Sequence, residues 1–510
     1  MDVKRIAAID LGSNSFHMLL AESATDGFTV YHKEKRQVAL AKGLNDNNEL
    51  SDESIELAPQ TLQLFTDALL QFRPDTVRIV GTFTFRTAKN ISKLTKQAQK
   101  FLPYPIEIMS GTEEARLIFE GVSHNNVLTE NHLVVDIGGG STEIIIGKDH
   151  TPLQLHSCDV GCVSLSSRFF SDGEITERAF KKAIIFAEQQ LDPIKKRYRK
   201  TGWRHVMGTS GTIKAIYNFI AHEATESDAD INPSDVVITL KGLKKIKETL
   251  LNTEKVSDIN LAGVNESRYG VICGGLAVLI AVFEIMKIDS MSYCDYALRE
   301  GLIAEIEDRI QLNDIRDFTV SQLSSRFNVD IEQAYRVEKD ALLLFDNAQD
   351  EWQFKSKSSR NLLRWACQLH EVGTHLNHQK AHQHAHYIVS NATLSGFNQE
   401  QQEVLAYILL SQRKALRPEL IPELSSHVES DIFKIILLLR IAILLNRFRQ
   451  EEETYCASAE FSKNKIQLLF GEEWLSGAEL FSADLEKEQQ RFAKIDLVLA
   501  FSFSEPDSSR

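Results

Sequence analysis

Two stretches of the sequence combine carboxylates with a turn of glycine and serine, an arrangement suited to phosphate chemistry. Residues 7–21, AAIDLGSNSFHMLLA, align without gaps on residues 133–147, LVVDIGGGSTEIIIG. Glycine lets backbone N–H groups approach an anion closely, so each turn is a candidate phosphate site. Carboxylates beside phosphate repel it unless a cation lies between them, so Asp10, Asp136 and Glu143 are candidate Mg²⁺ ligands. Capping of a turn through an Asx bond is the structural alternative for the two aspartates.

Two other positions are candidate phosphate contacts. Residues 208–212, GTSGT, precede a helical stretch, so their N–H groups lie at a helix N-terminus, which favours an anion. Gly208, Ser210 and Gly211 are the candidates within this segment. Arg86 follows the apolar run VRIVGTF, and a guanidinium at a strand end can bind phosphate bidentately. A surface arginine is an equally good interpretation of Arg86.

Glu114 is the candidate general base. In the segment SGTEEARLIFEG, Ser110 and Glu113 form a capping box that begins a helix and explains Glu113 structurally. Glu114 shares a helix face with Leu117 and Ile118, which predicts that its side chain points inward. A carboxylate that faces phosphates can activate water, an effect typically worth roughly 10²–10⁴ in rate. Interaction with the helix dipole is the alternative role.

The elements that must position these residues alternate between strands and helices. Each aligned stretch predicts a β-hairpin, and the strands predicted over residues 77–86 and 104–110 flank a helical stretch, which indicates α/β architecture. After the second hairpin, a helix is predicted over residues 177–200. Later segments have a 3.6-residue periodicity and then two alternating apolar runs around a charged helix. We predict two α/β domains over 1–120 and 121–303, an all-helical domain over 304–451 and a small α+β domain over 452–510.

Composition limits the possible functions of the 510-residue chain. A formal net charge of −14 argues against a nucleic-acid partner, because such proteins need a wide basic surface. The N-terminus has no long apolar segment, and the stretch IFKIILLLRIAILL is interrupted by Lys434 and Arg440. The six cysteines are scattered without a CxxC pair, as in a reducing compartment. We therefore expect a cytoplasmic protein without stable membrane insertion.

Two local concentrations of side chains allow binding roles. Residues 195–205, KKRYRKTGWRH, hold six lysines or arginines, and Lys195, Lys196 and Arg197 are candidates for a polyanion track. A solvated helix face is the alternative. Residues 369–387 hold six of the fifteen histidines, but no carboxylate partners follow at a recognisable spacing. We therefore do not expect a metal site in that segment.

Taken together, the segments IDLGSNSFHM, SGTEEARLIF, VDIGGGSTEIIIG, MGTSGT and ALREG resemble the motifs of the exopolyphosphatase/guanosine pentaphosphate phosphohydrolase (Ppx/GppA phosphatase) family, in that order. The resemblance implies two domains of the actin, sugar-kinase and Hsp70 type (ribonuclease H-like), and a homodimer. It implies Mg²⁺-dependent hydrolysis of a terminal phosphoanhydride, which releases orthophosphate from inorganic polyphosphate or converts pppGpp to ppGpp. By motif, Glu114 is the catalytic base and Asp136 and Glu143 place metal and water. The residues implied to hold the terminal phosphates are Ser13, Asn14, Arg86, Gly138, Gly139, Gly140 and Ser141.

The helical domain resembles HD-type phosphohydrolases with an incomplete ligand set. The His-Asp pair of those enzymes is His370-Glu371 in this sequence, and the position of the distant aspartate is Ile443. We therefore expect a scaffold for the substrate chain or a dimer partner instead of a second hydrolytic centre. The candidate contacts for a long polyphosphate tail are Lys380, Arg413 and Lys414.

Four functions remain open at the level of sequence. The segments DIGGGSTE, PYPIEI, FNQEQQ and DLEKEQ are more similar to the exopolyphosphatase branch, so a processive exopolyphosphatase is the leading expectation. A pppGpp 5′-phosphohydrolase that uses the same site is the first alternative. A non-catalytic sensor of alarmone or polyphosphate and a kinase of the same fold are the others.

Overall fold

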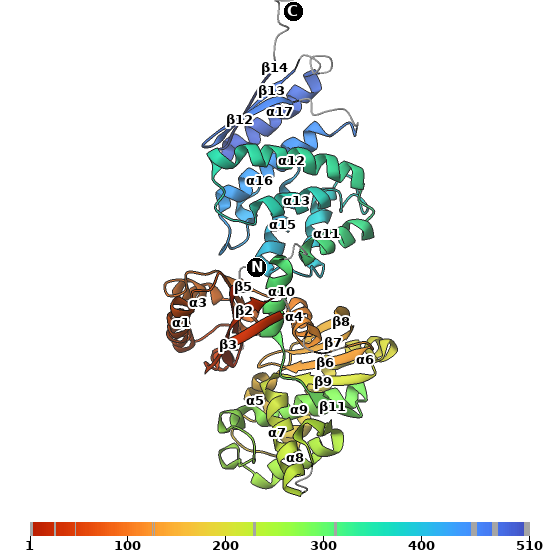
Figure 1. Ribbon diagram of the computed structural model, residues 1–510. Coiled ribbons are helices and arrows are strands. Elements are labelled where there is room, and N and C mark those ends of the chain that lie inside the picture. The colour runs from red at the N-terminus through yellow and green to blue at the C-terminus, as the bar shows by residue number, and fades with distance from the viewer. Residues whose placement is uncertain are drawn as a thin grey trace, which may run out of the picture. The chain divides into compact units, whose positions relative to one another are not determined.

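The computed structural model describes residues 4–24, 27–45, 47–124, 126, 128–227, 231–310, 314–449, 456–471 and 478–503. The chain divides into two compact units, Met1–Asn313 and Asp314–Arg510 (Figure 1). The boundary expected from the sequence lay earlier, between residues 303 and 304. Helix α10 (Leu298–Ile310) belongs to the first unit because it packs against α4 (Gly111–His124).

The first sheet of unit 1 has the strand order β3-β2-β1-β4-β5. The predicted first hairpin is confirmed, since β1 and β2 pair antiparallel with Asp10 opposite His17. The predicted strand over residues 77–86 is wrong in its second half, because the strand ends at Gly81 and residues 83–87 form a helix in which Phe85 enters the core. The elements are β1 (Arg5–Leu11), β2 (Ser15–Ala24), β3 (Gly27–Gln37), η1 (Leu40–Gly43), α1 (Asp52–Phe72), β4 (Thr76–Gly81), α2 (Phe83–Thr87), α3 (Ile91–Ala98) and β5 (Ile106–Ile108).

The second sheet has the strand order β10-β11-β9-β6-β7-β8. The second predicted hairpin is also confirmed, with Asp136 opposite Glu143 across β6 and β7. Helix α6 begins at the predicted residue, Glu177. The elements are β6 (His132–Ile137), β7 (Thr142–Lys148), β8 (Thr151–Cys158), α5 (Cys162–Phe169), α6 (Glu177–Thr201), β9 (His205–Thr209), α7 (Ser210–Ser227), η2 (Pro233–Asp235), β10 (Ile238–Thr239), α8 (Leu240–Thr253), η3 (Val256–Asp258), η4 (Glu266–Arg268), α9 (Tyr269–Met286) and β11 (Ser290–Tyr293).

Alternating residues of the strands face different cores in unit 1. On β1, Ala7 and Ile9 pack with α1 and α3, whereas Ile6 and Ala8 face a central core. The central core contains α4 and α10 and also receives Val134 from the second sheet. Helices α4 and α10 therefore share one core with a face of each sheet.

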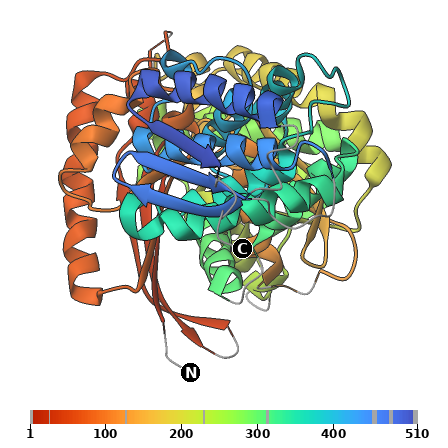
Figure 2. The ribbon, with the colours of Figure 1, turned by 90° about the horizontal axis from the view of Figure 1, so that it is seen from above.

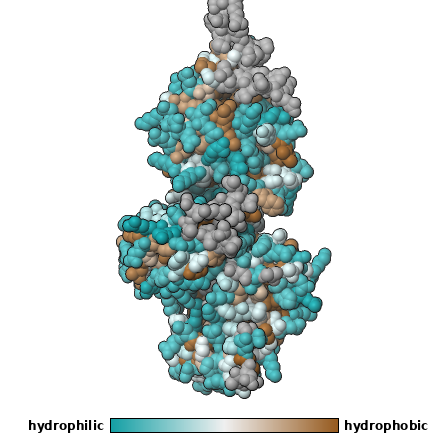
Figure 3. All heavy atoms as spheres, viewed as in Figure 1, coloured by the Kyte–Doolittle hydropathy of each residue, from teal (hydrophilic) through white to brown (hydrophobic). Residues whose placement is uncertain are grey.

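Helix α9 contains the most apolar long segment of the described chain. Residues 266–286 are long and apolar enough to cross a membrane by composition, with a mean hydropathy of 2.1 in the relevant window, of which 78% is buried. In α9 every residue from Val271 to Phe283 is buried in the core of the second sheet. Figure 3 shows apolar residues only in separate patches on the visible face.

Unit 2 contains the predicted helices followed by a three-stranded sheet in the order β12-β13-β14. Figure 2 shows the sheet beside α17. One hydrophobic core includes both the helices and the sheet, and Trp352 Nε1 donates to Ser462 O at 3.0 Å. The elements are α11 (Ile315–Arg326), α12 (Ile331–Trp352), α13 (Ser359–Leu369), α14 (Ala381–Asn391), α15 (Gln399–Ser411), η5 (Pro418–Leu420), α16 (Glu429–Leu445), β12 (Cys456–Ser462), β13 (Lys465–Phe470), α17 (Ala478–Phe492), η7 (Ala493–Ile495) and β14 (Val498–Phe503).

Candidate active site

The two hairpin loops and the start of α4 line one cavity of about 400 Å³ in unit 1. Asp10 lies near the end of β1, Asp136 near the end of β6, and Glu114 in the first turn of α4. All three side chains line the cavity. Residues far apart in the sequence thus converge in one acidic site.

Glu114 faces this cavity, as its helix position predicted, and it is only 8% exposed. Its Oε2 accepts a hydrogen bond from Arg86 Nη1 at 2.9 Å, and the same nitrogen donates to Met109 O at 3.0 Å. Burial raises the pKa of Glu114, and the Arg86 guanidinium acts in the opposite direction. Glu114 therefore has the burial and basicity expected of a general base.

The cap predicted at the start of α4 is present at Ser110. Ser110 Oγ accepts from the Glu113 N–H at 3.2 Å, as expected. The Glu113 carboxylate, however, binds Arg116 Nε and Nη2 at 2.9 and 2.7 Å. Glu113 thus belongs to a buried charged network that also includes Glu305 and Arg78.

Asp136 and Glu143 are direct neighbours across the β6–β7 pair but differ in access. Asp136 lines the cavity, whereas Glu143 does not line it, is fully buried and accepts from Ser157 Oγ of β8 at 2.7 Å. Burial and the nearby Glu114 charge raise the pKa of Asp136 to about 8, and the same causes raise that of Glu143. Burial likewise raises the pKa of half-buried Asp10 to about 7.

The chemistry of this carboxylate set fits a hard divalent cation. Asp10 Oδ1 and Glu143 Oε2 are buried without a hydrogen-bond partner in the described part of the chain. Oxygen ligands of this kind are those that Mg²⁺ binds, and a cation would offset the burial and the like-charge repulsion that raise these pKa values. Asp10 and Asp136 line the cavity, whereas Glu143, the cross-strand neighbour of Asp136, is fully buried and does not line it.

In both hairpin loops the carbonyl groups are held by a neighbouring helical segment. Ser13 O accepts from the Ala41 N–H, and Gly139 O accepts from the N–H groups of Val163 and Ser164 in α5. The C=O of one residue and the N–H of the next point in opposite directions across a trans peptide. The N–H groups of Asn14 and Gly140 therefore point away from these segments, which suits anion binding.

Close packing requires glycine at two positions of the second loop. A Cβ atom on Gly139 would lie 2.8 Å from Ser13 Cβ, and one on Gly140 would lie 2.1 Å from the Phe83 ring. The two loops thus contact each other, which the glycine run alone did not indicate. Gly138, Gly139 and Ser141 line the cavity together with Ser13 and Asn14, whereas Gly140 faces Phe83 instead.

The predicted third contact segment is partly at the cavity. Ser210 and Gly211 begin α7 and line the cavity, and Ser210 Oγ is buried without a partner among the described residues. Gly208 lies earlier, in β9, where a Cβ would lie 2.5 Å from Met291 Sδ. Arg86 does not line the cavity and reaches it only through Glu114, although its Nη2 is also unpaired within the described chain.

The sequence analysis missed a set of basic side chains that line the same cavity. They come from β3, α7, η4 and α10, and they are Lys33, Lys35, Lys214, Arg268 and Arg299. His17 of β2 also lines the cavity, but burial and the neighbouring Arg299 lower its pKa well below the usual range, so its ring carries no charge. Burial and the neighbouring arginines lower the pKa of Lys35 to about 8. Arg299 lies in the ALREG motif, which was the one available signal, because the other residues are scattered along the sequence. The cavity therefore combines its carboxylates with lysine and arginine side chains that can bind a polyanion.

The candidate tail contacts lie elsewhere. Lys195, Lys196 and Arg197 are on α6, where Lys195 pairs with Asp192, and none of the three lines the cavity. Lys380, Arg413 and Lys414 belong to unit 2, where Arg413 Nη1 donates to His378 O at 3.3 Å.

The HD-like positions of unit 2 have internal partners. His370 is buried, with Nδ1 2.7 Å from Cys367 O, and burial lowers its pKa. Glu371 forms an ion pair with Arg449, and Ile443 lies on α16. These contacts explain His370 and Glu371 as structural residues.

Comparisons with known proteins agree with this architecture. The profile described as the Ppx/GppA phosphatase family matches residues 19–310, and the profile for domain III of Ppx/GppA phosphatase matches residues 315–489. Proteins named guanosine-5′-triphosphate,3′-diphosphate pyrophosphatase, from Photobacterium profundum and Aeromonas hydrophila, are 34% and 35% identical to this chain. The first match covers 98% of both chains, and the second covers 96% of this chain and 97% of the relative.

A solved structure gives the same fold for much of the chain. The crystal structure of an exopolyphosphatase from Cytophaga hutchinsonii has a TM-score of 0.54 and 24% sequence identity. The similarity covers 60% of this chain and 98% of that one. The α/β part of the chain therefore has the actin-like fold expected from the motifs.

Proposed function

Because the chain belongs to the Ppx/GppA phosphatase family and is a hydrolase of phosphoanhydride bonds, we propose that it converts pppGpp to ppGpp and orthophosphate. The observation that carries the proposal is the pair of nearly full-length relatives named for guanosine-5′-triphosphate,3′-diphosphate. This reverses the order of the two substrates that the short motifs had favoured. The exopolyphosphatase preference rested on four brief segments, whereas these matches span 96–98% of the chain.

A second cavity supports a nucleotide substrate. It has a volume of about 370 Å³, shares Lys35, Lys214 and Arg268 with the catalytic cavity, and adds the amides of Gln37, Asn218 and Asn265. Lysine and arginine suit a second phosphate group, such as the 3′-diphosphate. Amides both donate and accept, and a guanine base offers both kinds of partner, whereas a phosphate chain offers only acceptors.

In the proposed mechanism the terminal 5′-phosphate lies between the two hairpin loops. The Asn14 N–H group and the start of α7, both at the cavity, bind its oxygens. A water molecule attacks the terminal phosphorus while its proton passes to Glu114 Oε, and the bond to the bridging oxygen breaks. The electron pair of that bond stays on ppGpp, and orthophosphate leaves. Arg86 orients Glu114 through the 2.9 Å hydrogen bond.

Mg²⁺ is part of the proposal. Asp10 and Asp136 would hold the ion directly. Glu143, the buried cross-strand neighbour of Asp136, would contact the ion through water or orient the Asp136 carboxylate. When bound, the ion neutralises phosphate charge and polarises the bond that breaks. We also propose a homodimer, as the resemblance implies, and a cytoplasmic location, as the composition indicates. Sedimentation velocity tests the oligomeric state.

Inorganic polyphosphate is the second candidate substrate. The fold of the Cytophaga exopolyphosphatase is shared, and the lysine and arginine side chains of the cavity can bind any chain of phosphates. A phosphate-only chain would leave the amides of the second cavity without matching donors, which is why we rank it second.

The test is release of orthophosphate from pppGpp and from long-chain polyphosphate in parallel, with Mg²⁺ and with chelator. The expected result is Mg²⁺-dependent release with a higher kcat/KM for pppGpp and with ppGpp as the only nucleotide product. A higher kcat/KM for polyphosphate would reverse the ranking. Release from neither substrate, with retained binding of pppGpp, would favour the sensor.

A further inference from the structure

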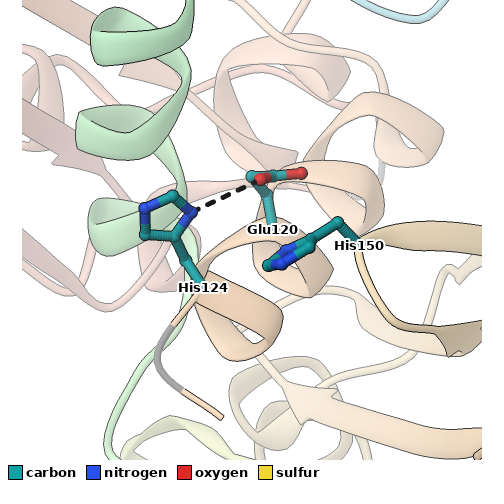
Figure 4. Close-up of side chains that lie close together, drawn as sticks. All are labelled: Glu120, His124 and His150. Atoms are coloured by element: carbon teal, nitrogen blue, oxygen red, sulfur yellow. Dashed lines mark ion pairs between the residues drawn. The ribbon is translucent and has the colours of Figure 1, made fainter. Parts of the chain in front are cut away.

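Outside the catalytic cleft, one group of side chains has the composition of a transition-metal site. Glu120, His124 and His150 each offer a ligand atom, and these atoms all lie within 4.8 Å of one another. Figure 4 shows the carboxylate and the two imidazoles converging from α4 and from the turn between β7 and β8. Among the described residues, no other group of three or more histidine, cysteine, aspartate or glutamate side chains brings its ligand atoms this close together.

Local structure fixes where these ligands stand. Glu120 and His124 are four residues apart on α4, so they share one helix face, and His124 Nδ1 lies 3.9 Å from Glu120 Oε1. The imidazole of His150 approaches that of His124 edge-on, with ring centroids 6.0 Å apart. The preceding residue, Asp149, has a φ of 53° and donates its N–H to Leu128 O at 2.6 Å, which anchors the turn to the chain after α4.

The distances are close to those of a bound ion. With Zn–N bonds of about 2.0–2.1 Å, neighbouring ligands of a tetrahedral site stand about 3.3 Å apart. Because the ligand atoms all lie within 4.8 Å of one another, they need to approach by at most about 1.5 Å. His124 and His150 are exposed, so their side chains have the freedom to make it. His124 is also the last residue of α4, and a helix C-terminus favours a cation.

We propose that Glu120, His124 and His150 bind a divalent transition-metal ion of the zinc class, separate from the Mg²⁺ of the cleft. Two imidazoles and one carboxylate suit zinc, nickel or copper, whereas Mg²⁺ prefers oxygen ligands only. Ten residues separate Glu114 from His124 on α4, which is about 15 Å along the helix axis. The open coordination positions would be filled by water.

The consequence is a link between two elements of the catalytic centre. Helix α4 carries Glu114 at its start and two of the ligands at its end, and β7 carries Glu143 near its start and leads at its other end into the turn with His150. A bound ion joins the end of α4 to that turn. Binding only to the folded state also stabilises the fold in proportion to ion concentration.

The test is titration of the metal-free full-length protein with Zn²⁺ by calorimetry, with excess Mg²⁺ present to occupy the cleft. The wild type is expected to bind one Zn²⁺ per chain. The variants His124→Ala and His150→Ala are expected to bind Zn²⁺ at this site at least about tenfold more weakly. Glu120→Gln should weaken the same site. Unchanged melting temperatures without zinc verify that the variants are folded.

His205→Ala is the matched control. His205 lies 3.5 Å from Glu130 and stacks on His132 with centroids 5.0 Å apart, so it shares the residue types without the convergence. It should keep the wild-type zinc stoichiometry. Three results would each overturn the proposal. They are a loss of zinc binding in His205→Ala as large as in His124→Ala, equal zinc binding by the wild type and His150→Ala, and no zinc binding by the wild type.

X-ray absorption of the zinc-loaded protein gives a second readout. Only nitrogen and oxygen ligands near 2.0–2.1 Å are expected, because the described cysteines, Cys158, Cys162, Cys273, Cys294 and Cys367, are all buried. Sulfur at about 2.3 Å would assign the zinc to cysteine and contradict the site.

Discussion

Arg86 Nη1 donates a hydrogen bond to Glu114 Oε2 at 2.9 Å and so joins α2 to the first turn of α4. This bond sets both the orientation and the basicity of the proposed base. Burial raises the pKa of Glu114, and Arg86 is the charge that holds it down. Arg86 thus acts on the reaction through Glu114 instead of lining the cavity.

Arg86→Gln should move the acidic limb of the pH profile to higher pH. Without the guanidinium the pKa of Glu114 rises further, so Glu114 stays protonated, and inactive as a base, up to a higher pH. The profile of kcat/KM against pH measures the shift. Arg178→Gln, an exposed position on α6, is the control and should leave the profile unchanged. A uniform loss of rate without a shifted limb would contradict this role.

Glu114→Gln should lower kcat for pppGpp by roughly 10²–10⁴, the range for loss of a general base. The amide keeps the size of the side chain and can still pair with Arg86, so the melting temperature should change little. Steady-state release of orthophosphate measures the effect, with the exposed Glu56→Gln on α1 as control. Retention of more than half of the activity would remove Glu114 from the mechanism.

Without divalent metal, the free energy of unfolding should fall as pH rises from about 4 to about 8. The pKa values of Asp10 and Asp136 are raised to about 7 and about 8, so over this range the folded state binds more protons than the unfolded state, whose aspartates titrate near 3.9. Stability therefore decreases until both groups have ionised. Melting temperatures in chelator between pH 5 and pH 8, at fixed ionic strength, measure the slope.

Asp136→Asn should raise the metal-free melting temperature at pH 8 and reduce the stabilisation by Mg²⁺. The change removes a buried charge that repels Glu114 and Asp10, and about 1 kcal/mol corresponds to roughly 2–4 °C in a domain of 150–250 residues. Melting with and without Mg²⁺ tests both statements. A variant that is less stable than wild type in chelator, yet equally stabilised by Mg²⁺, would show that Asp136 is not a ligand.

Gly140→Ala should lower stability and activity together. The new Cβ would lie 2.1 Å from the Phe83 ring, and overpacking of this kind costs typically about 1–3 kcal/mol. The double variant Gly140→Ala, Phe83→Leu should recover part of both losses, because the smaller side chain leaves room for the methyl group. Double-mutant analysis of melting and kcat measures the coupling, and strictly additive losses would refute the contact.

Lys214→Ala should reduce kcat/KM for pppGpp by roughly 10–100-fold, the range for loss of a hydrogen bond to a charged group. Lys214 lines both cavities, so a substrate that occupies only the first should be affected less. Tripolyphosphate is that comparison substrate. Lys244→Ala on α8, where the lysine pairs with Glu284 at 3.1 Å, is the control. Equal losses for both substrates would argue against the second cavity as a nucleotide site.

Local sequence patterns predicted the parts of the site that lie on single elements. The alignment of the two carboxylate turns predicted both hairpins, and the spacing of Glu114 to Leu117 and Ile118 predicted its inward side chain. These features depend on residues a few positions apart. Periodicity and turn chemistry act at that range.

Features that depend on tertiary packing were not predictable in this way. Lys35 and Arg268 reach the cavity from β3 and η4, and no spacing in the sequence connects them. The Phe83 ring of another element leaves no room for a side chain at position 140. Asp136 and Glu143 flank the same turn, yet only Asp136 lines the cavity and Glu143 is fully buried. The short motifs favoured polyphosphate, whereas the nearly full-length relatives are named for guanosine-5′-triphosphate,3′-diphosphate, because motifs common to a family carry little information on its branches.

The central core of unit 1 has a consequence for the autonomy of its halves. Ile6 and Ala8 of the first sheet pack on α4 and α10, and α10 is contributed by the chain after residue 297. A fragment ending at residue 120 keeps the first part of α4 but lacks α10, which packs on β1 and β2, so we would expect the exposed sheet face to make the fragment aggregate or be degraded. The two similar hairpins therefore do not mark two domains that fold independently. We would not expect recombination at residue 120 to give a domain that folds alone.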